Sequence, residues 1–163
     1  MSSESTEALV EIKWKCKSFD ELTNLELYRI MQLRNQVFVV EQRIVFNDAD
    51  GRDPLALHLF GYYPGEDGEL CAYCRIFEPG VVYGGATIGR VCSNLKLRRK
   101  GCGKALMREA VRECYSRFGQ GQLIELGAQL YLQRFYEELG FKHDGSPVYL
   151  DGDQIDHIHM TRG

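Results

Sequence analysis

The chain has 163 residues, of which 44% are hydrophobic and 26% are charged, and its formal net charge is −3. This length suits one domain, and the composition is that of an ordinary globular protein, which excludes a disordered, collagen-like or coiled-coil chain. The slightly acidic balance argues against a protein that binds nucleic acid. The longest aliphatic and aromatic run, Val37 to Val40, is far shorter than the roughly 20 residues that a membrane span needs.

Residues 1–9 are rich in Ser, Glu and Thr, and we predict that they form a disordered tail before a single domain at 10–163. The tail lacks the basic and apolar regions of a secretory signal, so we expect a cytoplasmic protein with no membrane partner. The six cysteines are then expected to be reduced. Cys71 and Cys74 form a lone CxxC pair, and residues three apart on a strand face opposite sides. Because a zinc site needs further ligands, no metal site is predicted.

A first strand is predicted at 10–19, followed by a helix. Thr23 and Glu26 have the spacing of a capping box. Apolar residues then recur at helical spacing until the helix ends near Gln42. The Asp-rich stretch 43–55 is predicted to be a loop.

The rest of the chain predicts an alternation of strands and helices. Hydrophobic periodicity and turn residues mark strands at 56–63, 69–77, 86–93 and 123–128, helices at 101–118 and 130–139, and late strands at 141–149 and 157–161. This order predicts an α/β domain of mixed α+β type, with a largely antiparallel and partly parallel sheet. An exposed late strand is a candidate for pairing in a homodimer.

The most informative stretch joins the strand at 86–93 to the helix at 101–118. Five basic residues and two glycines occur there: Lys96, Arg98, Arg99, Lys100 and Lys104, with Gly101 and Gly103. Glycines let backbone amides approach a ligand, and the free amides of a helix N-terminus favour phosphate. Basic residues are unfavourable at the start of an isolated helix, so an anionic ligand would explain them. The alternative is a solvated basic turn without a ligand.

Two well-known nucleotide motifs do not fit this turn. The Walker A loop requires Gly where Arg98 stands and Ser or Thr where Ala105 stands. The Rossmann motif requires Gly in place of Leu106. A different phosphate ligand at the glycines stays open as an alternative.

The pattern Arg98-x-x-Gly101-x-Gly103, between a strand and a helix, resembles the cofactor motif of the GNAT acetyltransferase superfamily. The segment Phe135 to Phe141 (FYEELGF) resembles the FYxxLGF segment of the same superfamily. Further segments extend the resemblance to ElaA-like GNAT proteins over nearly the whole chain: Leu33-Arg34, Val37 to Gln42, Asp48 to Gly51, His58, Ile88 to Val91, Ala128-Gln129 and His157 to Met160. The chain departs from that group at Ile44-Val45-Phe46, where Cys-Pro-Tyr is frequent, and at Arg99, where Gly is usual.

The resemblance implies the GNAT fold, with a central mixed, mostly antiparallel twisted sheet of six to seven strands and about three to four flanking helices. It also implies acetyl-CoA as cosubstrate and no metal. The backbone of Val91 to Ser93 would pair with the pantetheine arm, and the basic turn would hold the pyrophosphate. The residues implied in cofactor binding are Val91, Cys92, Ser93, Arg98, Arg99, Lys100, Gly101, Cys102, Gly103, Lys104 and Gln129.

The implied reaction is the transfer of an acetyl group to a primary amine, by direct attack on the thioester. The acceptor would be a small molecule, such as an amino sugar phosphate, or a protein amine. Tyr136 is at the position of the general acid that protonates the leaving thiolate, and Glu41 is the candidate general base. Glu125, His58, His157 or water are alternative bases. The alternative to an enzyme is a non-catalytic acyl-CoA sensor of the same fold.

Three arginines are predicted to lie on regular elements: Arg34, Arg75 and Arg90. Because a buried arginine needs a partner, we predict an internal ion-pair network with the loop residues Asp48, Asp50 and Asp53. Substrate recognition is the second interpretation of these arginines.

Overall fold

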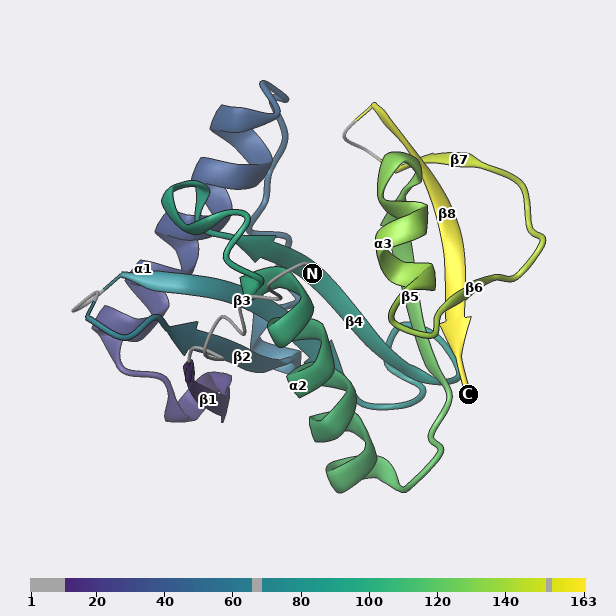
Figure 1. Ribbon diagram of the computed structural model, residues 1–163, viewed down its shortest axis with the longest axis horizontal. Helices are drawn as coiled ribbons and strands as arrows, with labels where there is room; N and C mark the ends of the chain where they lie inside the picture. Colours follow the sequence, from purple (N-terminus) through teal and green to yellow (C-terminus); the bar gives the residue numbers. More distant parts are fainter. Residues whose placement is uncertain (1–10, 66–68, 152–153) are drawn as a thin grey trace, which may run out of the picture.

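The computed structural model describes residues 11–65, 69–151 and 154–163 (Figure 1). The tail predicted at 1–9, the first residue of the strand predicted at 10–19, and residues 66–68 and 152–153 lie outside the described residues. The strands are β1 (Lys13–Ser18), β2 (Leu57–Tyr62), β3 (Leu70–Phe77), β4 (Ala86–Ser93), β5 (Ile124–Gln129), β6 (Lys142–His143), β7 (Tyr149–Asp151) and β8 (Ile155–Arg162). The α-helices are α1 (Asn24–Arg34), α2 (Cys102–Phe118) and α3 (Gln133–Glu137).

The strands form one mixed sheet in the order β1-β2-β3-β4-β5-β8, and β6 and β7 both pair with the outer edge of β8. Every neighbouring pair is antiparallel except β4 and β5, which are parallel. The described sheet thus has eight strands rather than the predicted six to seven. The strand predicted at 141–149 is divided because Pro147 has no backbone N–H and Gly145 has a φ of 85°, which interrupts the extended chain.

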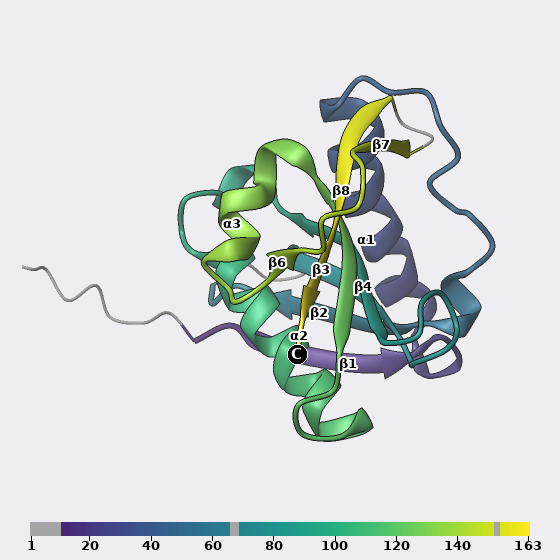
Figure 2. The same ribbon diagram turned by 90° about the vertical axis from the view of Figure 1, so that its right-hand side faces the viewer.

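The helices cover the two faces of the sheet, as Figure 2 shows with α1 on one side and α2 and α3 on the other. Leu106 and Met107 of α2 belong to the larger core cluster, with buried residues of β3, β4 and β5. Ile30 and Leu33 of α1 belong to a second cluster, with Tyr73 of β3. No helix within the described residues is long and apolar enough to cross a membrane.

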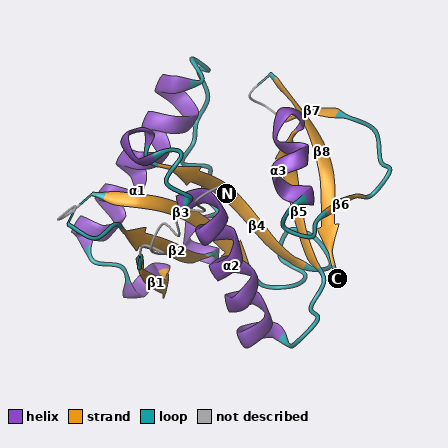
Figure 3. Ribbon diagram, viewed as in Figure 1, coloured by secondary structure: helices purple, strands orange, loops and turns teal. Residues whose placement is uncertain are grey.

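The helix that begins at α1 has the predicted N-terminus. The Glu26 amide donates to Thr23 Oγ1 at 3.1 Å, and the Thr23 amide donates to Glu26 Oε1 at 2.9 Å, which confirms the capping box. After Arg34 the chain continues as a π-helical turn, Asn35–Glu41, which ends close to the predicted end at Gln42. Figure 3 shows these helical segments and the strands by type. The π-helical turn places Glu41 at the end of the helical segment.

Cys71 and Cys74 do not face opposite sides of β3, so that prediction is wrong. The pairing of β2 with β3 shifts between Gly61 and Tyr62, which leaves Cys71 as an extra residue of β3. Both thiols therefore belong to the core cluster that contains α2. All six cysteines are free thiols.

The two central strands separate along their length. β4 and β5 pair only at Ala86 with Ile124 and at Thr87 with Glu125. Figure 1 shows the two strands close together at this end and apart at the other. The separation leaves a split within the sheet between β4 and β5, and the candidate site lies beside it.

Candidate active site

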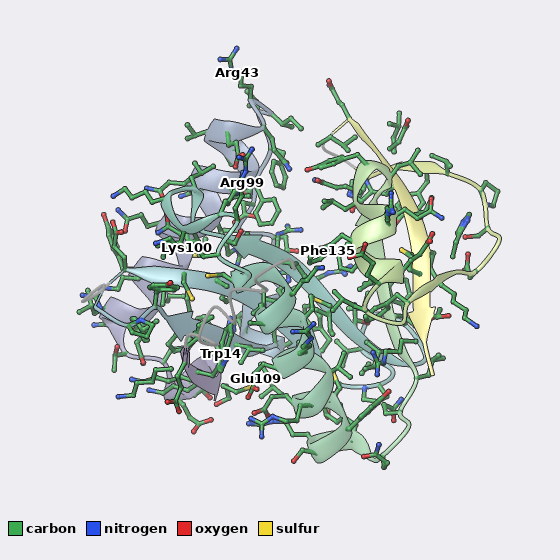
Figure 4. The ribbon with its side chains drawn as sticks, viewed as in Figure 1. Trp14, Arg43, Arg99, Lys100, Glu109 and Phe135 are labelled. Atoms are coloured by element: carbon green, nitrogen blue, oxygen red, sulfur yellow. The ribbon has the colours of Figure 1, made fainter. Side chains whose placement is uncertain are left out.

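A pocket of about 360 Å³ opens at the basic turn between β4 and α2. It is lined by Ser93, Leu97, Arg98, Arg99, Gly101, Cys102, Gly103, Lys104 and Phe135. All of these residues except Leu97 and Phe135 are among those predicted to bind the cofactor. Arg99 and Lys100 extend from the turn, and Phe135 comes from α3 (Figure 4). The structure thus brings most of the predicted cofactor residues together at one concave surface.

The glycines give the turn its shape. Gly101, the N-cap of α2, has a φ of 78°, a left-handed conformation that favours glycine. A Cβ at Gly103 would meet only the Phe135 ring, at 3.6 Å, so the space beside this residue is open. Arg99 also has a left-handed φ, of 69°, at the position where the resemblance predicts glycine. The first amides of α2 have no helical acceptor, and together with the helix dipole they favour an anion.

The edge of β4 that faces β5 is open beyond Thr87. On its other edge, Cys92 and Ser93 pair with β3, and an irregularity in that pairing places Arg90 at a φ of 50°. No pairing with β5 follows Thr87 in the part of the chain that the structure describes. The backbone from Val91 to Ser93 can therefore pair with an extended ligand on the β5 side.

Two basic side chains at the pocket are paired with carboxylates from other elements. The Arg98 guanidinium donates to both oxygens of Glu41, with Nη2 at 2.7 Å from Oε2. Lys104 Nζ lies 3.0 Å from Glu138 Oε2. Glu41, the predicted general base, thus lies against a residue predicted to bind the cofactor. An anionic ligand in the pocket would compete with Glu41 for Arg98.

Tyr136, the predicted general acid, is buried on α3. Its ring packs edge-on against Phe135, with centroids 5.0 Å apart, and against Phe141, at 6.1 Å. Burial raises the pKa of the Tyr136 hydroxyl, and the nearby thiols of Cys74 and Cys92 act in the same direction. The hydroxyl therefore stays protonated at neutral pH, as a proton donor must.

Gln129 lies at the end of β5, next to the C-terminal end of the π-helical turn Asn35–Glu41. Its Oε1 accepts a hydrogen bond from Gln42 Nε2 at 3.2 Å. The predicted cofactor contact of Gln129 therefore lies beside the end of the first helical segment, and not at the basic turn.

The predicted ion-pair network is confirmed. The pairs are Arg34 with Asp48 (2.8 Å) and Asp53 (2.7 Å), Arg75 with Asp50 (2.6 Å) and Asp53 (2.9 Å), and Arg90 with Asp48 (2.8 Å). Arg34 is completely buried, and Asp48 is nearly so. The network ties the loop after the first helical segment to α1, β3 and β4.

His58 has a structural environment. It is buried, with Nδ1 at 2.8 Å from the Tyr73 hydroxyl and Nε2 at 2.9 Å from the Asp53 carbonyl oxygen. Burial lowers its pKa, so the neutral ring is favoured. His157 is also buried, and its Nδ1 lies 2.7 Å from the Ile155 carbonyl oxygen. Among the described residues, no group of three or more His, Cys, Asp or Glu side chains could hold a metal ion.

One polar pair was not predicted from the sequence as a unit. His159 Nε2 lies 3.0 Å from Glu125 Oε1, across the paired strands β5 and β8. Glu125 was an alternative base, but His159 was not. In the sequence, the spacing of His157 and His159 indicates only that both lie on one face of a strand. Glu125 could be recognised as the partner of His159 only once the pairing of β5 with β8 was known.

Comparison with known proteins identifies the family. Residues 65–162 match the acetyltransferase (GNAT) domain family. The chain is 36% identical to protein ElaA of Escherichia coli K12 over 153 residues, which cover 93% of this chain and 96% of that protein. The chain belongs to the GNAT acetyltransferase family. The predicted enzyme class, an acyltransferase, is thereby confirmed.

Solved structures of GNAT proteins confirm the fold. The crystal structure of Escherichia coli ElaA matches with a TM-score of 0.82 at 35% identity, covering 94% of this chain and all of that one. An acyl-CoA N-acyltransferase from Pseudomonas aeruginosa matches with a TM-score of 0.85 at 37% identity, with the same coverage. An aminoglycoside 6′-N-acetyltransferase solved with coenzyme A shares the fold, with a TM-score of 0.66 at 18% identity. This GNAT protein therefore has the predicted mixed fold.

Proposed function

We propose that this GNAT protein transfers an acetyl group from acetyl-CoA to a primary amine, on a small molecule or a protein. The observation that carries the proposal is the pocket at the basic turn, beside the open edge of β4. The Pseudomonas aeruginosa relative is named an acyl-CoA N-acyltransferase, and the more distant aminoglycoside acetyltransferase was solved with coenzyme A. Both names support an acyl-CoA ligand for this chain.

The residues at the pocket fit such a ligand. The turn from Arg98 to Lys104 offers basic side chains and helix amides to a pyrophosphate, and Gly103 leaves room for close approach. The backbone from Val91 to Ser93 would pair with the pantetheine arm, and Gln129 would contact the ligand from β5. When bound, acetyl-CoA supplies a thioester whose acetyl group passes to the amine.

Tyr136 is the proposed proton donor to the leaving sulfur. Its burial among aromatic rings keeps the hydroxyl protonated at neutral pH. A positioned general acid contributes typically 10²–10⁴-fold to a rate. Glu41 stays a prediction for the base, although its carboxylate is held by Arg98.

The remaining features are predictions carried over from the sequence. They are a single domain at 10–163, a cytoplasmic location and a homodimer formed through a late strand.

The cofactor claim is tested by thermal unfolding with acetyl-CoA, and with NAD and ATP as comparison ligands. A ligand at about 100 times its dissociation constant adds roughly 2.7 kcal/mol of stability, which raises Tm by several degrees for a chain of this size. We expect the wild type to shift with acetyl-CoA alone. An equal shift with NAD or ATP would contradict acetyl-CoA as the ligand of this pocket.

The variant Gly103→Val tests the location of the site. Its side chain would enter the pocket beside Phe135, so we expect the acetyl-CoA shift to be lost while the unliganded protein still unfolds cooperatively. Gly84→Val is the matched control, because a Cβ at Gly84 meets no atom within 4 Å and this residue is outside the pocket. A normal acetyl-CoA shift in Gly103→Val would place the site elsewhere.

A further inference from the structure

Glu125 and His159 lie on the sheet face opposite α2. Residues alternate along β5, so Ile124, Leu126 and Ala128 enter the core that contains α2, and Glu125, Gly127 and Gln129 lie on the other face. In the pairing of β5 with β8, His159 is opposite Gly127. Gly127 is exposed although β5 is a central strand, because β4 separates from β5 beyond Thr87. The Tyr149 hydroxyl lies against Gly127, in the place that a Cβ would take, so this face of β5 is partly covered and an acceptor would have to reach the Glu125–His159 pair beside Tyr149.

The carboxylate of Glu125 is held at both oxygens. Oε2 accepts the Gly85 backbone N–H at 2.7 Å, and Oε1 lies 3.0 Å from His159 Nε2. A carboxylate can only accept hydrogen bonds, so Nε2 of His159 carries the hydrogen. In the neutral ring, Nδ1 is then the nitrogen with a free electron pair. Within the described residues, Nδ1 of His159 has no hydrogen-bond partner.

The imidazole is also fixed in orientation. The Tyr83 ring packs edge-on against it, with centroids 4.7 Å apart. Only 15% of the His159 side chain and 14% of the Glu125 side chain are exposed. His58, by contrast, uses both ring nitrogens in hydrogen bonds to the protein. A ring held by one nitrogen, with the other nitrogen free, is the arrangement of an oriented base.

We propose that His159 is the general base that takes the proton of the acceptor ammonium, and that Glu125 is the residue that positions it. The inference deepens the proposed function and rests on it. An N–H bond of the ammonium breaks, and its proton passes to Nδ1 of His159, so the neutral amine is free to attack. Glu125 stabilises the resulting imidazolium, which then releases the proton to water. The acceptor class is therefore a primary amine that is protonated in solution.

Several polar and titratable groups surround His159. Glu125 faces it from β5, and Tyr83 from the connection before β4. The carboxylate of Asp144, which follows β6, interacts electrostatically with His159, and the Asp144 backbone N–H donates to the His159 carbonyl oxygen at 3.1 Å. Tyr149 of β7 and His157 of β8 stack on each other on the same face, with ring centroids 5.7 Å apart.

The test measures kcat/KM against pH, by release of CoA from acetyl-CoA with a panel of primary amines that includes polyamines, amino sugars, amino acids and lysine peptides. We expect the wild type to lose activity as pH falls. His159→Gln should lower kcat by about 10²-fold or more and remove this acid limb. Glu125→Gln should lower kcat less and displace the limb, because it acts through His159. His143→Gln, on the neighbouring strand β6, is the matched control and should keep the wild-type profile.

A second measurement does not depend on turnover. Side-chain ¹⁵N NMR of the unliganded protein should show His159 with its hydrogen on Nε2, and the Glu125→Gln variant should change that signal. A hydrogen on Nδ1 in the wild type would overturn the proposal. So would an unchanged acid limb in His159→Gln, or loss of that limb in Glu41→Gln instead.

The failure of the inference is distinguishable from the failure of the proposed function. If His159→Gln keeps the acid limb while acetyl-CoA still raises Tm and amines still release CoA, only the base assignment is wrong. If acetyl-CoA stabilises the protein but no amine in the panel releases CoA, both the amine transfer and its base are overturned.

Discussion

Tyr136 shows how one side chain serves packing and chemistry together. Its ring lies between Phe135 and Phe141, and only 5% of the residue is exposed. The aromatic contacts fix the ring, so the hydroxyl has little freedom to move. Burial also raises the pKa of the hydroxyl, which keeps the proton available at neutral pH. Removing the oxygen alone therefore separates the two roles.

Tyr136→Phe should lower kcat by about 10²-fold or more and leave the acetyl-CoA thermal shift unchanged. Phenylalanine keeps the ring contacts, so the fold and the pocket are retained. The measurements are CoA release and thermal unfolding, with Tyr28→Phe as a control because Tyr28, on α1, is 70% exposed. Unchanged turnover at every pH would remove Tyr136 from the mechanism.

At the scale of elements, the segment after α1 is held by charge rather than by regular structure. Asp48, Asp50 and Asp53 lie in or beside a loop, and each pairs with an arginine of α1, β3 or β4. Arg90 is part of the irregularity in β4 and pairs with Asp48. The network therefore connects this loop to the strand whose open edge is proposed to bind acetyl-CoA.

Asp48→Asn should destabilise the protein by about 3–5 kcal/mol, because it leaves the fully buried Arg34 with an incomplete ion pair. Urea unfolding measures the loss. Asp20→Asn, at an exposed position, is the control and should change stability by less than about 0.5 kcal/mol. A loss of less than 1 kcal/mol in Asp48→Asn would show that the network does not stabilise the fold.

Across the whole molecule, several carboxylates are more acidic in the folded chain than in the unfolded chain. Burial opposes ionisation of Glu26, but hydrogen bonds from Thr23 and Lys17 lower its pKa to about 2. Hydrogen bonds from Arg75 lower the pKa of Asp50. Burial opposes ionisation of Asp53 too, yet its contacts with Arg34 and Arg75 lower its pKa. These carboxylates stabilise the fold only while they are ionised.

The stability of the protein should therefore fall in acid. The contribution of a carboxylate with a depressed pKa is complete above its unfolded pKa, near 4, and is lost as the pH falls toward the folded pKa. We expect the Tm to be nearly constant from pH 7 to about 5 and to decrease steeply below about 4. The variant Glu26→Gln should have a lower Tm than the wild type at pH 7, because it lacks this carboxylate, and its Tm should decrease less as the pH falls. An equal decrease in this variant would show that Glu26 does not contribute.

Much of the fold could be predicted because its signals are local. The predicted strand 86–93 coincides with β4, and the predicted helix 101–118 differs from α2 by one residue, since Gly101 and Gly119 mark the helix ends. The prediction of one late strand at 141–149 was wrong, because Gly145 and Pro147 divide that segment into β6 and β7. The cofactor residues at the basic turn are close in sequence, so their grouping at one pocket could also be predicted.

The sequence by itself determined the helix caps, the basic glycine turn and the family, because each depends on residues that are close together along the chain. The tertiary structure alone decided that β4 separates from β5 after two residue pairs, that Glu41 meets Arg98, and that Glu125 meets His159. The residues in each of those contacts are separated by between 34 and 57 positions in the sequence. Strand order and register, and not local propensity, bring them together. For that reason His159 could not be recognised as the proposed base from the sequence.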